Sequence, residues 1–425
     1  MKKAAIVFIG AGSMSFGIPT FRDLFTTREL AGASLRLVDI DPENLERMYD
    51  LAIKMNEVSG LGFEISKTVN RLEALPGADY VVNSLAIERC ELWKHDFRVP
   101  LKHGIKHCLG ENGGPGALFF AMRTIPLILD ICKDMERLCP DAWFLNFSNP
   151  ESRIVLAVNK YTKIKCIGLC HGVFMGLDDI AKILEMPPSE IEIAAAGLNH
   201  FQWITSIRRK SDNTDLYPLF KEKEKSFDPA FSPFTRKIFK AFGYWPTCSD
   251  DHLGEYLMYG YEGGMHGYDF ESDEQDRVKM KKDIADMVSG KRDAKEWLVK
   301  SGEKAVEVIT ALHTGVQASI PSAIVYNLGA ITNLPPDLAV EIPIVADGSG
   351  IRKVQVGDMP KGAAALMSLQ VGVQQMAVEA AVHGDRQLAL QALLCDPVVN
   401  STDAAEKVLD ELWEVNKVYI KGLTS

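Results

Sequence analysis

The 425-residue sequence lacks an excess of basic residues, because its 47 lysines and arginines are outnumbered by 57 aspartates and glutamates. The net charge of −10 argues against nucleic-acid binding, which usually depends on a concentrated basic surface. Apolar runs of the roughly 18 residues needed to span a bilayer are also lacking, as are internal repeats and low-complexity segments. These absences predict a protein with no nucleic-acid partner and no membrane partner.

Cysteine is scarce, because only eight are scattered along this long chain. That density is far from the density of a disulfide scaffold, so we expect a reducing compartment, the cytoplasm. The N-terminus has two lysines followed by AAIVFIGAG, which superficially resembles a signal peptide. Its apolar stretch is short and runs directly into a glycine turn, so we interpret it as a first strand.

The first part of the chain alternates between strand and helix patterns, which is typical of a parallel sheet. The apolar runs predict six strands, at 3–10, 34–40, 63–69, 78–86, 142–150 and 165–171. Helical spacing between them predicts helices at 15–27, 42–59, 117–138 and 151–161. We therefore expect a Rossmann-like, doubly wound NAD-binding domain over residues 1–195, as in lactate and malate dehydrogenases.

From about residue 190 the sequence no longer alternates regularly between strand and helix patterns. Sheet strands are expected at 191–200, 201–210, 322–335 and 339–351, and charged amphipathic helices over 271–312. The chain closes with a helical region over 360–420. Residues 196–425 are thus predicted to form an α+β domain for catalysis and oligomerisation.

Residues 8–15 read FIGAGSMS, so Gly10 and Gly12 lie between a predicted strand and a predicted helix. Two glycines there permit a tight turn and close approach of a pyrophosphate to a helix N-terminus. Asp39 ends the second strand, where its carboxylate can bind both ribose hydroxyls and repel the 2′-phosphate of NADP. The pattern predicts NAD, bound by Gly10, Gly12, Ser13, Met14 and Asp39. The alternative is a purely structural glycine turn.

Cys170 and His200 each fall at the end of a predicted strand, and ligands of open α/β sheets bind at the carboxyl ends of the strands. A thiolate and a neutral imidazole suit a divalent transition metal with open positions for substrate oxygens. The alternative is that the cysteine is a small core residue and the histidine a structural one.

A set of motifs in fixed order carries a more specific signal: FIGAGS near the start, GENGGPGALFFAMRTIP at 110–126, NFSNP at 146–150, CHGV at 170–173, LNHFQW at 198–203, DDHLGEY at 250–256 and NLGAITNLPPDLAVEIPIV at 327–345. Together these motifs resemble glycoside hydrolase family 4, the NAD- and manganese-dependent glycosidases. The resemblance implies that Cys170 and His200 bind Mn²⁺ or another divalent transition metal. It further implies that Asn149 contacts sugar hydroxyls, and that Glu111 and Asn112 line the cofactor and sugar pocket.

The resemblance also implies an unusual hydrolysis. NAD⁺ takes hydride from C3 of the sugar, the C2 proton is removed, the glycosidic oxygen is eliminated, water adds at C1, and NADH returns the hydride. Members that cleave 6-phosphorylated sugars carry Asp or Asn after the motif cysteine, whereas this chain has His171. CHGV is most similar to the α-glucosidase and α-galacturonidase-like branch, so the expected substrates are unphosphorylated α-glycosides, including α-galacturonides or α-glucuronides. Family members form homodimers and homotetramers.

The resemblance also implies an aspartate base in the stretch 249–252, for which Asp250 is the first candidate; Asp251 and, outside this stretch, Tyr256 are the alternatives. Asp250 could instead cap a helix that starts near 251. His171 is a candidate acid for the leaving oxygen and a candidate sugar contact. A uronate carboxylate favours an arginine, because a guanidinium can grip it through two hydrogen bonds; Arg89 and Arg153 are the candidates, unless each forms an ordinary ion pair.

Two other functions fit the fold. An NAD-dependent dehydrogenase of small hydroxy acids would accumulate NADH and need no metal, and a non-catalytic NAD-binding regulator would need no pairing of Cys170 with His200.

Overall fold

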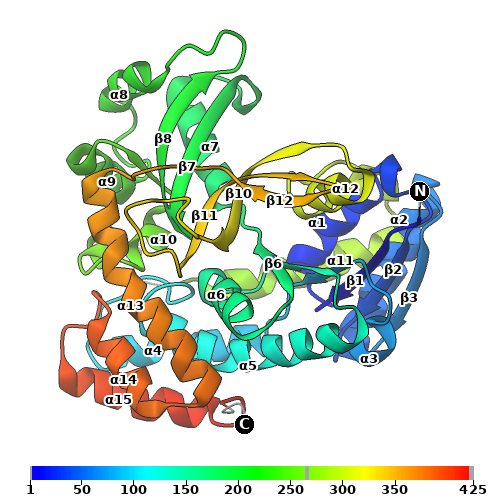
Figure 1. Ribbon diagram of the computed structural model, residues 1–425, viewed down its shortest axis with the longest axis horizontal. Coiled ribbons are helices and arrows are strands. Elements are labelled where there is room, and N and C mark those ends of the chain that lie inside the picture. Colours follow the sequence, from blue (N-terminus) through cyan, green and yellow to red (C-terminus); the bar gives the residue numbers. More distant parts are fainter. Residues whose placement is uncertain (1, 264–267, 421–425) are drawn as a thin grey trace.

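The computed structural model describes residues 2–263 and 268–420. Its sheet has the strand order β3-β2-β1-β4-β5-β6-β10-β11-β7-β8-β9, with β12 paired to β11 (Figure 1). The first six strands in this order are mutually parallel: β3 (Glu64–Thr68), β2 (Ser34–Val38), β1 (Ala5–Ile9), β4 (Tyr80–Asn83), β5 (Trp143–Asn146) and β6 (Lys165–Gly168). The order 3-2-1-4-5-6 confirms the predicted Rossmann-like half.

The residues of the parallel half explain its layering. All five residues of β1 are buried, as expected of a central strand with helices on both faces, whereas β3 at the edge alternates between exposed and half-buried positions. The connecting helices are α1 (Met14–Leu24), α2 (Pro42–Ser59), α3 (Arg71–Ala74), α4 (Arg89–Lys102), α5 (Gly114–Leu138) and α6 (Glu151–Tyr161).

Helix α5 is the longest helix of the described chain and lies in the lower half of the view in Figure 1. It is long and apolar enough to span a membrane, but 89% of its most apolar window is buried inside the protein. Its apolar side chains therefore form core, packing against α4, α6 and α13 (Lys361–His383). The sequence pattern did not predict α4 or α7 (Gly172–Leu184), which begins directly after the CHGV motif's first two residues.

The antiparallel half continues the same sheet beyond β6. Its strands are β10 (Ala318–Tyr326), β11 (Ala339–Asp347), β7 (Ile191–Leu198), β8 (Phe201–Arg209), β9 (Trp245–Thr247) and β12 (Gly350–Lys353). The predicted division at residue 195 falls inside β7, so the sheet runs across it, and the two-domain division stays a prediction.

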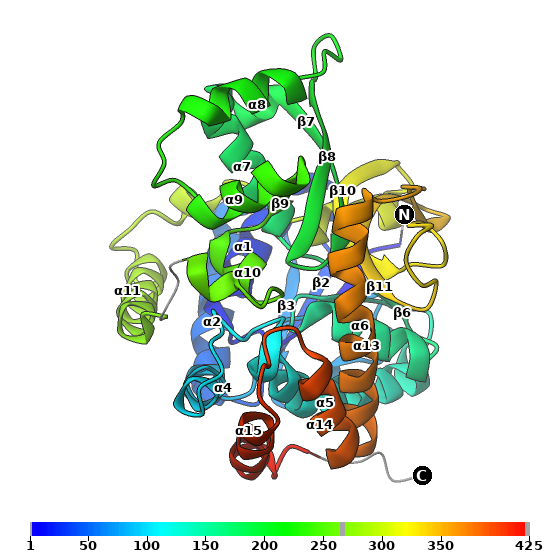
Figure 2. The same ribbon diagram turned by 90° about the vertical axis from the view of Figure 1, so that its left-hand side faces the viewer.

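The remaining helices are distributed over both halves (Figure 2). They are α8 (Tyr217–Ser226), α9 (Pro233–Phe242), α10 (Asp250–Gly254), α11 (Phe270–Val288), α12 (Ala305–Thr314), α14 (Arg386–Cys395) and α15 (Thr402–Asn416), with short 3-10 turns at Arg28–Leu30, Pro188–Glu190, Gly260–Gly263 and Ala294–Trp297. An α+β half joined to the parallel sheet confirms the predicted fold class. The carboxyl ends of the parallel strands, where ligands bind in such sheets, all lie along one edge.

Candidate active site

The glycine turn after β1 is shaped by contact with β4. Gly10 has a φ of 77°, and a Cβ there would lie 2.8 Å from the carbonyl carbon of Ser84, so only glycine fits. The Ser84 hydroxyl donates a hydrogen bond of 3.0 Å to the Gly10 carbonyl. The turn is therefore fixed against the end of the neighbouring strand, and α1 begins directly after it, at Met14, with Ser13 as its N-cap residue.

Asp39 lies beside this turn, as predicted. Its Oδ2 accepts a hydrogen bond of 2.8 Å from the Gly12 N–H, and its Oδ1 accepts one of 2.9 Å from the Asp41 N–H. A Cβ on Gly12 would lie 2.8 Å from the same carboxylate. Burial raises the pKa of Asp39. The carboxylate thus stands at the end of β2, where a ribose would approach the turn.

Hydrogen bonds connect the strand ends along this edge. Asn83, at the end of β4, donates through Nδ2 to Asn146 Oδ1 and to the Ser148 hydroxyl, both at 2.9 Å. Ser148 in turn donates to the Leu85 carbonyl at 2.6 Å. This network holds the NFSNP segment against the residue that follows Ser84, so Asn149 is placed on the same edge as the glycine turn.

Asn149 is half-buried and hydrogen-bonds to the carboxylate of Glu111. That carboxylate is 6% exposed and forms an ion pair of 2.7 Å with Nη1 of Arg89. Burial raises the pKa of Glu111, but the charges of Arg89 and His252, together with the hydrogen bonds that the carboxylate accepts, outweigh burial and the net shift is downward. Three residues predicted for the sugar pocket therefore meet, although they come from three separate segments, two loops and the start of α4.

Asn112 connects this group to His200. Its side-chain amide lies 2.9 Å from His200 Nδ1, and its Oδ1 accepts a hydrogen bond of 3.2 Å from the Glu151 N–H. Glu255 fixes the loop that contains Asn112, because its carboxylate accepts hydrogen bonds from the backbone N–H groups of residues 111, 112 and 113. Such a contact on one ring nitrogen is common for metal-binding histidines, because it fixes the orientation of the ring.

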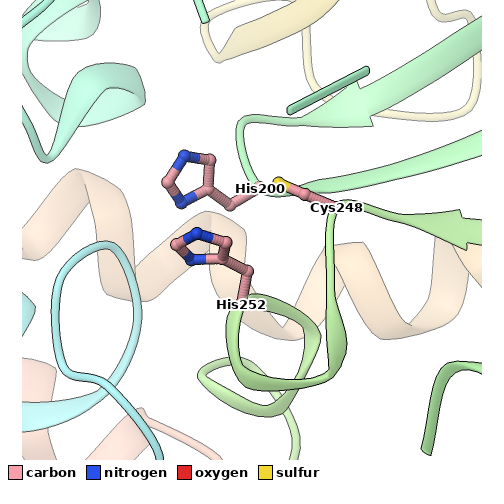
Figure 3. Close-up of side chains that lie close together, drawn as sticks. All are labelled: His200, Cys248 and His252. Atoms are coloured by element: carbon pink, nitrogen blue, oxygen red, sulfur yellow. The ribbon is translucent and has the colours of Figure 1, made fainter. Parts of the chain in front are cut away.

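His200 lies in the two-residue turn between β7 and β8 with a φ of 60°, a conformation that histidine tolerates better than most residues. The turn brings its ring to His252, with a distance of 4.1 Å between ring centroids. Potential ligand atoms of His200, Cys248 and His252 all lie within 4.8 Å of one another (Figure 3). We call these three residues the His–Cys–His cluster.

Cys170, the predicted sulfur ligand, lies next to the His–Cys–His cluster but is not one of its three residues. A Cβ placed on Gly172 would lie 2.5 Å from Cys248 Sγ and 3.6 Å from Cys170 Sγ, so both sulfurs lie against the same backbone. The Gly172 N–H points at Cys170 Sγ at 3.4 Å, and the Thr247 hydroxyl donates to the Gly172 carbonyl at 2.7 Å. These contacts join the start of α7 to the end of β9.

The electrostatics of the cluster suit a cation. Burial holds the pKa of His200 well below its usual value, so its ring is neutral and has a lone pair to give. Burial opposes charge on His252, but the carboxylates of Glu255, Asp251 and Glu111 outweigh it and raise its pKa to about 9. His252 Nδ1 is buried and lies 3.8 Å from Glu255 Oε1, too far for a hydrogen bond.

Two further buried carboxyl groups adjoin Cys170. Burial, followed by the charge of Glu341, raises the pKa of Glu151 well above its usual value, and burial raises that of Glu341 itself to about 7. Burial also raises the pKa of the Cys170 thiol, and the charges of the same two carboxyl groups raise it further. A divalent ion would relieve this accumulation of buried acid groups, so the residues present fit a metal ion.

His171 lies at the mouth of the site. It is the N-cap residue of α7, its side chain is 57% exposed, and its Nδ1 lies 3.6 Å from Glu303 Oε1. Besides burial, the charge of His171 lowers the pKa of His200, and the charge of His252 lowers the pKa of His171 itself. His171 is therefore accessible from solvent while close to the cluster.

The carboxylate of Asp250 is hydrogen-bonded to the N-terminus of a neighbouring helix, α9. Its carboxylate accepts hydrogen bonds from the backbone N–H groups of Phe234 and Thr235 and from the Thr235 hydroxyl, at the N-terminus of α9. Its role as base stays a prediction, and these contacts support a capping role, although for α9 and not for α10. Of the two residues behind it, Tyr256 donates its hydroxyl to the Asn199 carbonyl at 2.8 Å. The Asp251 carboxylate accepts from the Ser249 hydroxyl and, at 2.9 Å, from the His252 N–H.

The two arginines proposed for a uronate differ. Arg89 is 32% exposed in its side chain and lies 4.8 Å above the ring of Trp93 while pairing with Glu111. Arg153 is 1% exposed, and none of its guanidinium nitrogens has a hydrogen-bond partner among the described residues. Its pKa is lowered by burial, with Asp396 the first of the charges opposing that shift. Arg89 is thus the one of the two that is accessible to solvent.

Sequence reasoning missed Cys248, His252 and Glu255. His252 stands in the stretch from which the base was chosen, and Cys248 precedes that stretch directly. The signal that could have found them is this density of cysteine, acid and histidine within a few residues. Sequence spacing alone did not show that the stretch folds against the turn containing His200.

Comparisons with known proteins cover nearly the whole chain. The model described as "Family 4 glycosyl hydrolase" matches residues 5–186, and that of the "Family 4 glycosyl hydrolase C-terminal domain" matches residues 195–399. The chain is 34% identical to an alpha-galactosidase of Bacillus subtilis, with 93% of each covered. It is 31% identical to an alpha-glucosidase of Erwinia rhapontici, over 95% of this chain and 96% of that one. It is 29% identical to an alpha-galacturonidase of Thermoanaerobacter italicus, over 98% and 97%.

Solved structures agree in fold. A 6-phospho-alpha-glucosidase from gut microorganisms, in complex with NAD and glucose-6-phosphate, superposes with a TM-score of 0.87 at 27% identity over 100% of both chains. A second 6-phospho-alpha-glucosidase from gut microorganisms, in complex with NAD and Mn²⁺, has a TM-score of 0.84 at 20% identity over 100% of both chains, which is a likeness of fold.

Proposed function

Because the chain belongs to family 4 of the glycosyl hydrolases, we propose that it hydrolyses unphosphorylated α-glycosides with NAD and a divalent metal ion, Mn²⁺ by the family resemblance. The observation that carries the proposal is a continuous series of contacts along one sheet edge. It runs from Gly10 through Ser84 and the NFSNP segment to Glu111, and then through Asn112 to His200. A cofactor seated on the glycine turn and an ion at His200 would therefore face the same sugar.

The residues have separable tasks in this proposal. When bound, NAD supplies a hydride acceptor and the metal ion a Lewis acid. Asp39 binds the ribose, while Glu111 holds the Asn149 amide in the position where it meets sugar hydroxyls. Asn112 orients the ring of His200. His171, accessible at the mouth, is placed to give a proton to the leaving glycosidic oxygen.

The lack of a phosphate on the substrate is supported by two features. The residue after Cys170 is histidine, and its Nδ1 lies 3.6 Å from Oε1 of Glu303, whose carboxyl would disfavour a phosphate dianion. Three relatives of 31–34% identity are named for neutral sugars, two as alpha-galactosidases and one as an alpha-glucosidase, whereas a fourth, at 31% identity, is named a probable 6-phospho-beta-glucosidase. The solved structures named above act on 6-phosphorylated sugars, so the substrate is where this chain is proposed to differ from them.

An α-galacturonide is a second candidate substrate, favoured by Arg89. Its partly exposed guanidinium lies beside the Glu111–Asn149 pair that adjoins the sugar. Arg89→Ala should then lower turnover of a nitrophenyl α-galacturonide by at least about 100-fold, because the substrate carboxylate loses its charged partner, and leave neutral α-glycosides within about tenfold. Arg98→Ala, an exposed arginine of the same helix, is the control. Equal losses on both substrate classes would contradict the assignment.

The function is tested with a panel of nitrophenyl α-glycosides, α-uronides and 6-phospho-α-glycosides. The reduced enzyme is assayed with and without NAD⁺ and Mn²⁺. We expect nitrophenol release from the unphosphorylated substrates that requires both additions, without accumulation of NADH. Net NADH formation without a metal requirement would support a dehydrogenase of small hydroxy acids, and NAD binding without turnover a regulator; either result would refute the proposal.

We further propose a cytoplasmic homodimer or homotetramer. All eight cysteines are free thiols in the structure, which suits a reducing compartment. The oligomeric state is a prediction from the family resemblance, and light scattering of the purified protein tests it.

A further inference from the structure

We propose that Cys248 and His252 bind the catalytic metal ion together with His200 and Cys170, so that four side chains of this chain surround one site. The inference rests on the metal dependence of the proposed function. It goes beyond the cysteine–histidine pair that the family resemblance implies, because it adds a second sulfur and a second imidazole.

Geometry is the first support. The His–Cys–His cluster is assembled from the β7–β8 turn, the end of β9 and the start of α10, and its ligand atoms lie within 4.8 Å of one another. With metal–nitrogen and metal–sulfur bonds of about 2.0–2.3 Å, neighbouring ligands of a five- or six-coordinate ion, which keeps positions for substrate oxygens, stand roughly 3.0–3.5 Å apart. Closing the cluster around an ion thus requires side-chain shifts of about an ångström, well within rotamer adjustment.

The second support is the unsatisfied chemistry of the buried groups. His252 Nδ1 is buried without a hydrogen-bond partner among the described residues, and its ion-pair contact with Glu255 Oε1 is long, at 3.8 Å. Buried polar atoms in native proteins nearly always have a partner, so an orphan of this kind points to a missing ion or water. Figure 3 shows the two imidazole rings lying one above the other with the Cys248 sulfur beside them.

The third support is the position of Cys170. Both sulfurs pack against Gly172, where any side chain would collide with Cys248 Sγ at 2.5 Å. The hydrogen bond from Thr247 to the Gly172 carbonyl keeps the strand end and the helix start together. A glycine after His171 therefore lets two thiols approach one ion from the same side.

The proposed donor set has a chemical consequence. Each thiol releases its proton to solvent as a sulfur–metal bond forms, and no electron is transferred. Thiolate and imidazole ligands favour Zn²⁺, Co²⁺ and Fe²⁺, whereas Mn²⁺ prefers oxygen ligands. The second sulfur should therefore make this chain bind Zn²⁺ or Co²⁺ more tightly, relative to Mn²⁺, than a site with one sulfur.

The test counts sulfur ligands in the full-length protein. Metal-free enzyme is titrated with Co²⁺ in a phosphine reductant, and the thiolate-to-cobalt absorption band is measured per bound ion. We expect Cys248→Ser and Cys170→Ser each to lose about half of the band, and His252→Gln to keep the band while its Co²⁺ affinity falls at least about tenfold. Cys108→Ser, which removes another buried thiol, and His95→Gln, which removes an exposed histidine, should match the wild type.

X-ray absorption of the unmodified Zn²⁺-loaded protein gives a count that does not depend on whether a variant folds. Two sulfur neighbours support the inference, and one overturns it. If Cys248→Ser keeps the full band while Cys170→Ser abolishes it, the inference is wrong and the metal dependence of the proposed function stands. If the wild type binds no divalent ion at all, both the inference and that metal dependence fail.

Discussion

Replacing Asp250 by alanine separates a structural from a catalytic role. The carboxylate accepts hydrogen bonds from the Phe234 N–H at 3.1 Å, from the Thr235 N–H at 2.8 Å and from the Thr235 hydroxyl at 2.7 Å. Ser232, the N-cap residue of α9, makes no side-chain cap hydrogen bond. Asp250 therefore satisfies donors at the start of α9 that its own cap leaves open, and it places a negative charge at the positive end of the helix.

The magnitudes for the two roles differ enough to be told apart. Loss of an N-cap costs about 0.5–2 kcal/mol and loss of hydrogen bonds to a charged group about 1.5–3 kcal/mol. We expect Asp250→Ala to lower the free energy of unfolding by about 2–3 kcal/mol while kcat changes by less than about tenfold. Loss of a general base would instead lower kcat by about 10²–10⁴, which is about 3–5 kcal/mol in the activation barrier.

The assay pairs urea denaturation with turnover of the preferred nitrophenyl glycoside at saturating NAD⁺ and Mn²⁺. The matched control is Asp269→Ala, which removes the N-cap of α11, where Asp269 accepts one hydrogen bond of 2.9 Å from Ser272. That control should lose about 1 kcal/mol of stability and keep its activity. If turnover instead falls by about two orders of magnitude or more while the urea midpoint is unchanged, the capping role is refuted and the base prediction is supported.

Three other predictions concern the scaffold. Gly10→Ala should lower the free energy of unfolding by about 2–4 kcal/mol and weaken NAD binding measured by fluorescence titration, because it combines a left-handed conformation with a backbone contact of 2.8 Å; unchanged affinity would contradict the role of the turn. Arg123→Met should cost about 3–5 kcal/mol in chemical denaturation, because it leaves the fully buried Asp96 unpaired, and adding Asp96→Leu should recover most of the loss. Burial lowers the pKa of His107 to about 4, against an unfolded value of 6.5. The unfolded state therefore binds a proton first as the pH falls, and stability should decline between pH 6.5 and 4, by about 2 kcal/mol at pH 5. His107→Gln should remove this part of the pH dependence in urea titrations; an identical profile would rule the histidine out as its source.

The parallel half of the fold followed from local patterns. A central strand such as β1 is buried on both faces and appears as an unbroken apolar run, and α2 carries a proline at its start, a cap at Asp41 and a left-handed Gly60 at its end. These signals lie within a few residues of the element that they define. Helix α4 escaped prediction because its apolar residues are diluted by charged ones and include Pro100.

The sequence by itself determined the order of the six parallel strands, the glycine turn, the acidic residue at the end of β2 and the motif resemblance, because each depends on neighbours along the chain or on recognisable short strings. Only the tertiary structure decided which side chains meet. It brought Cys248 and His252 to His200 by pairing β9 with β8, assigned the Asp250 carboxylate to α9, and buried Arg153 while leaving Arg89 within reach of solvent. Those outcomes depend on how distant segments pack, and packing is a property of three-dimensional contacts that spacing along the chain does not encode.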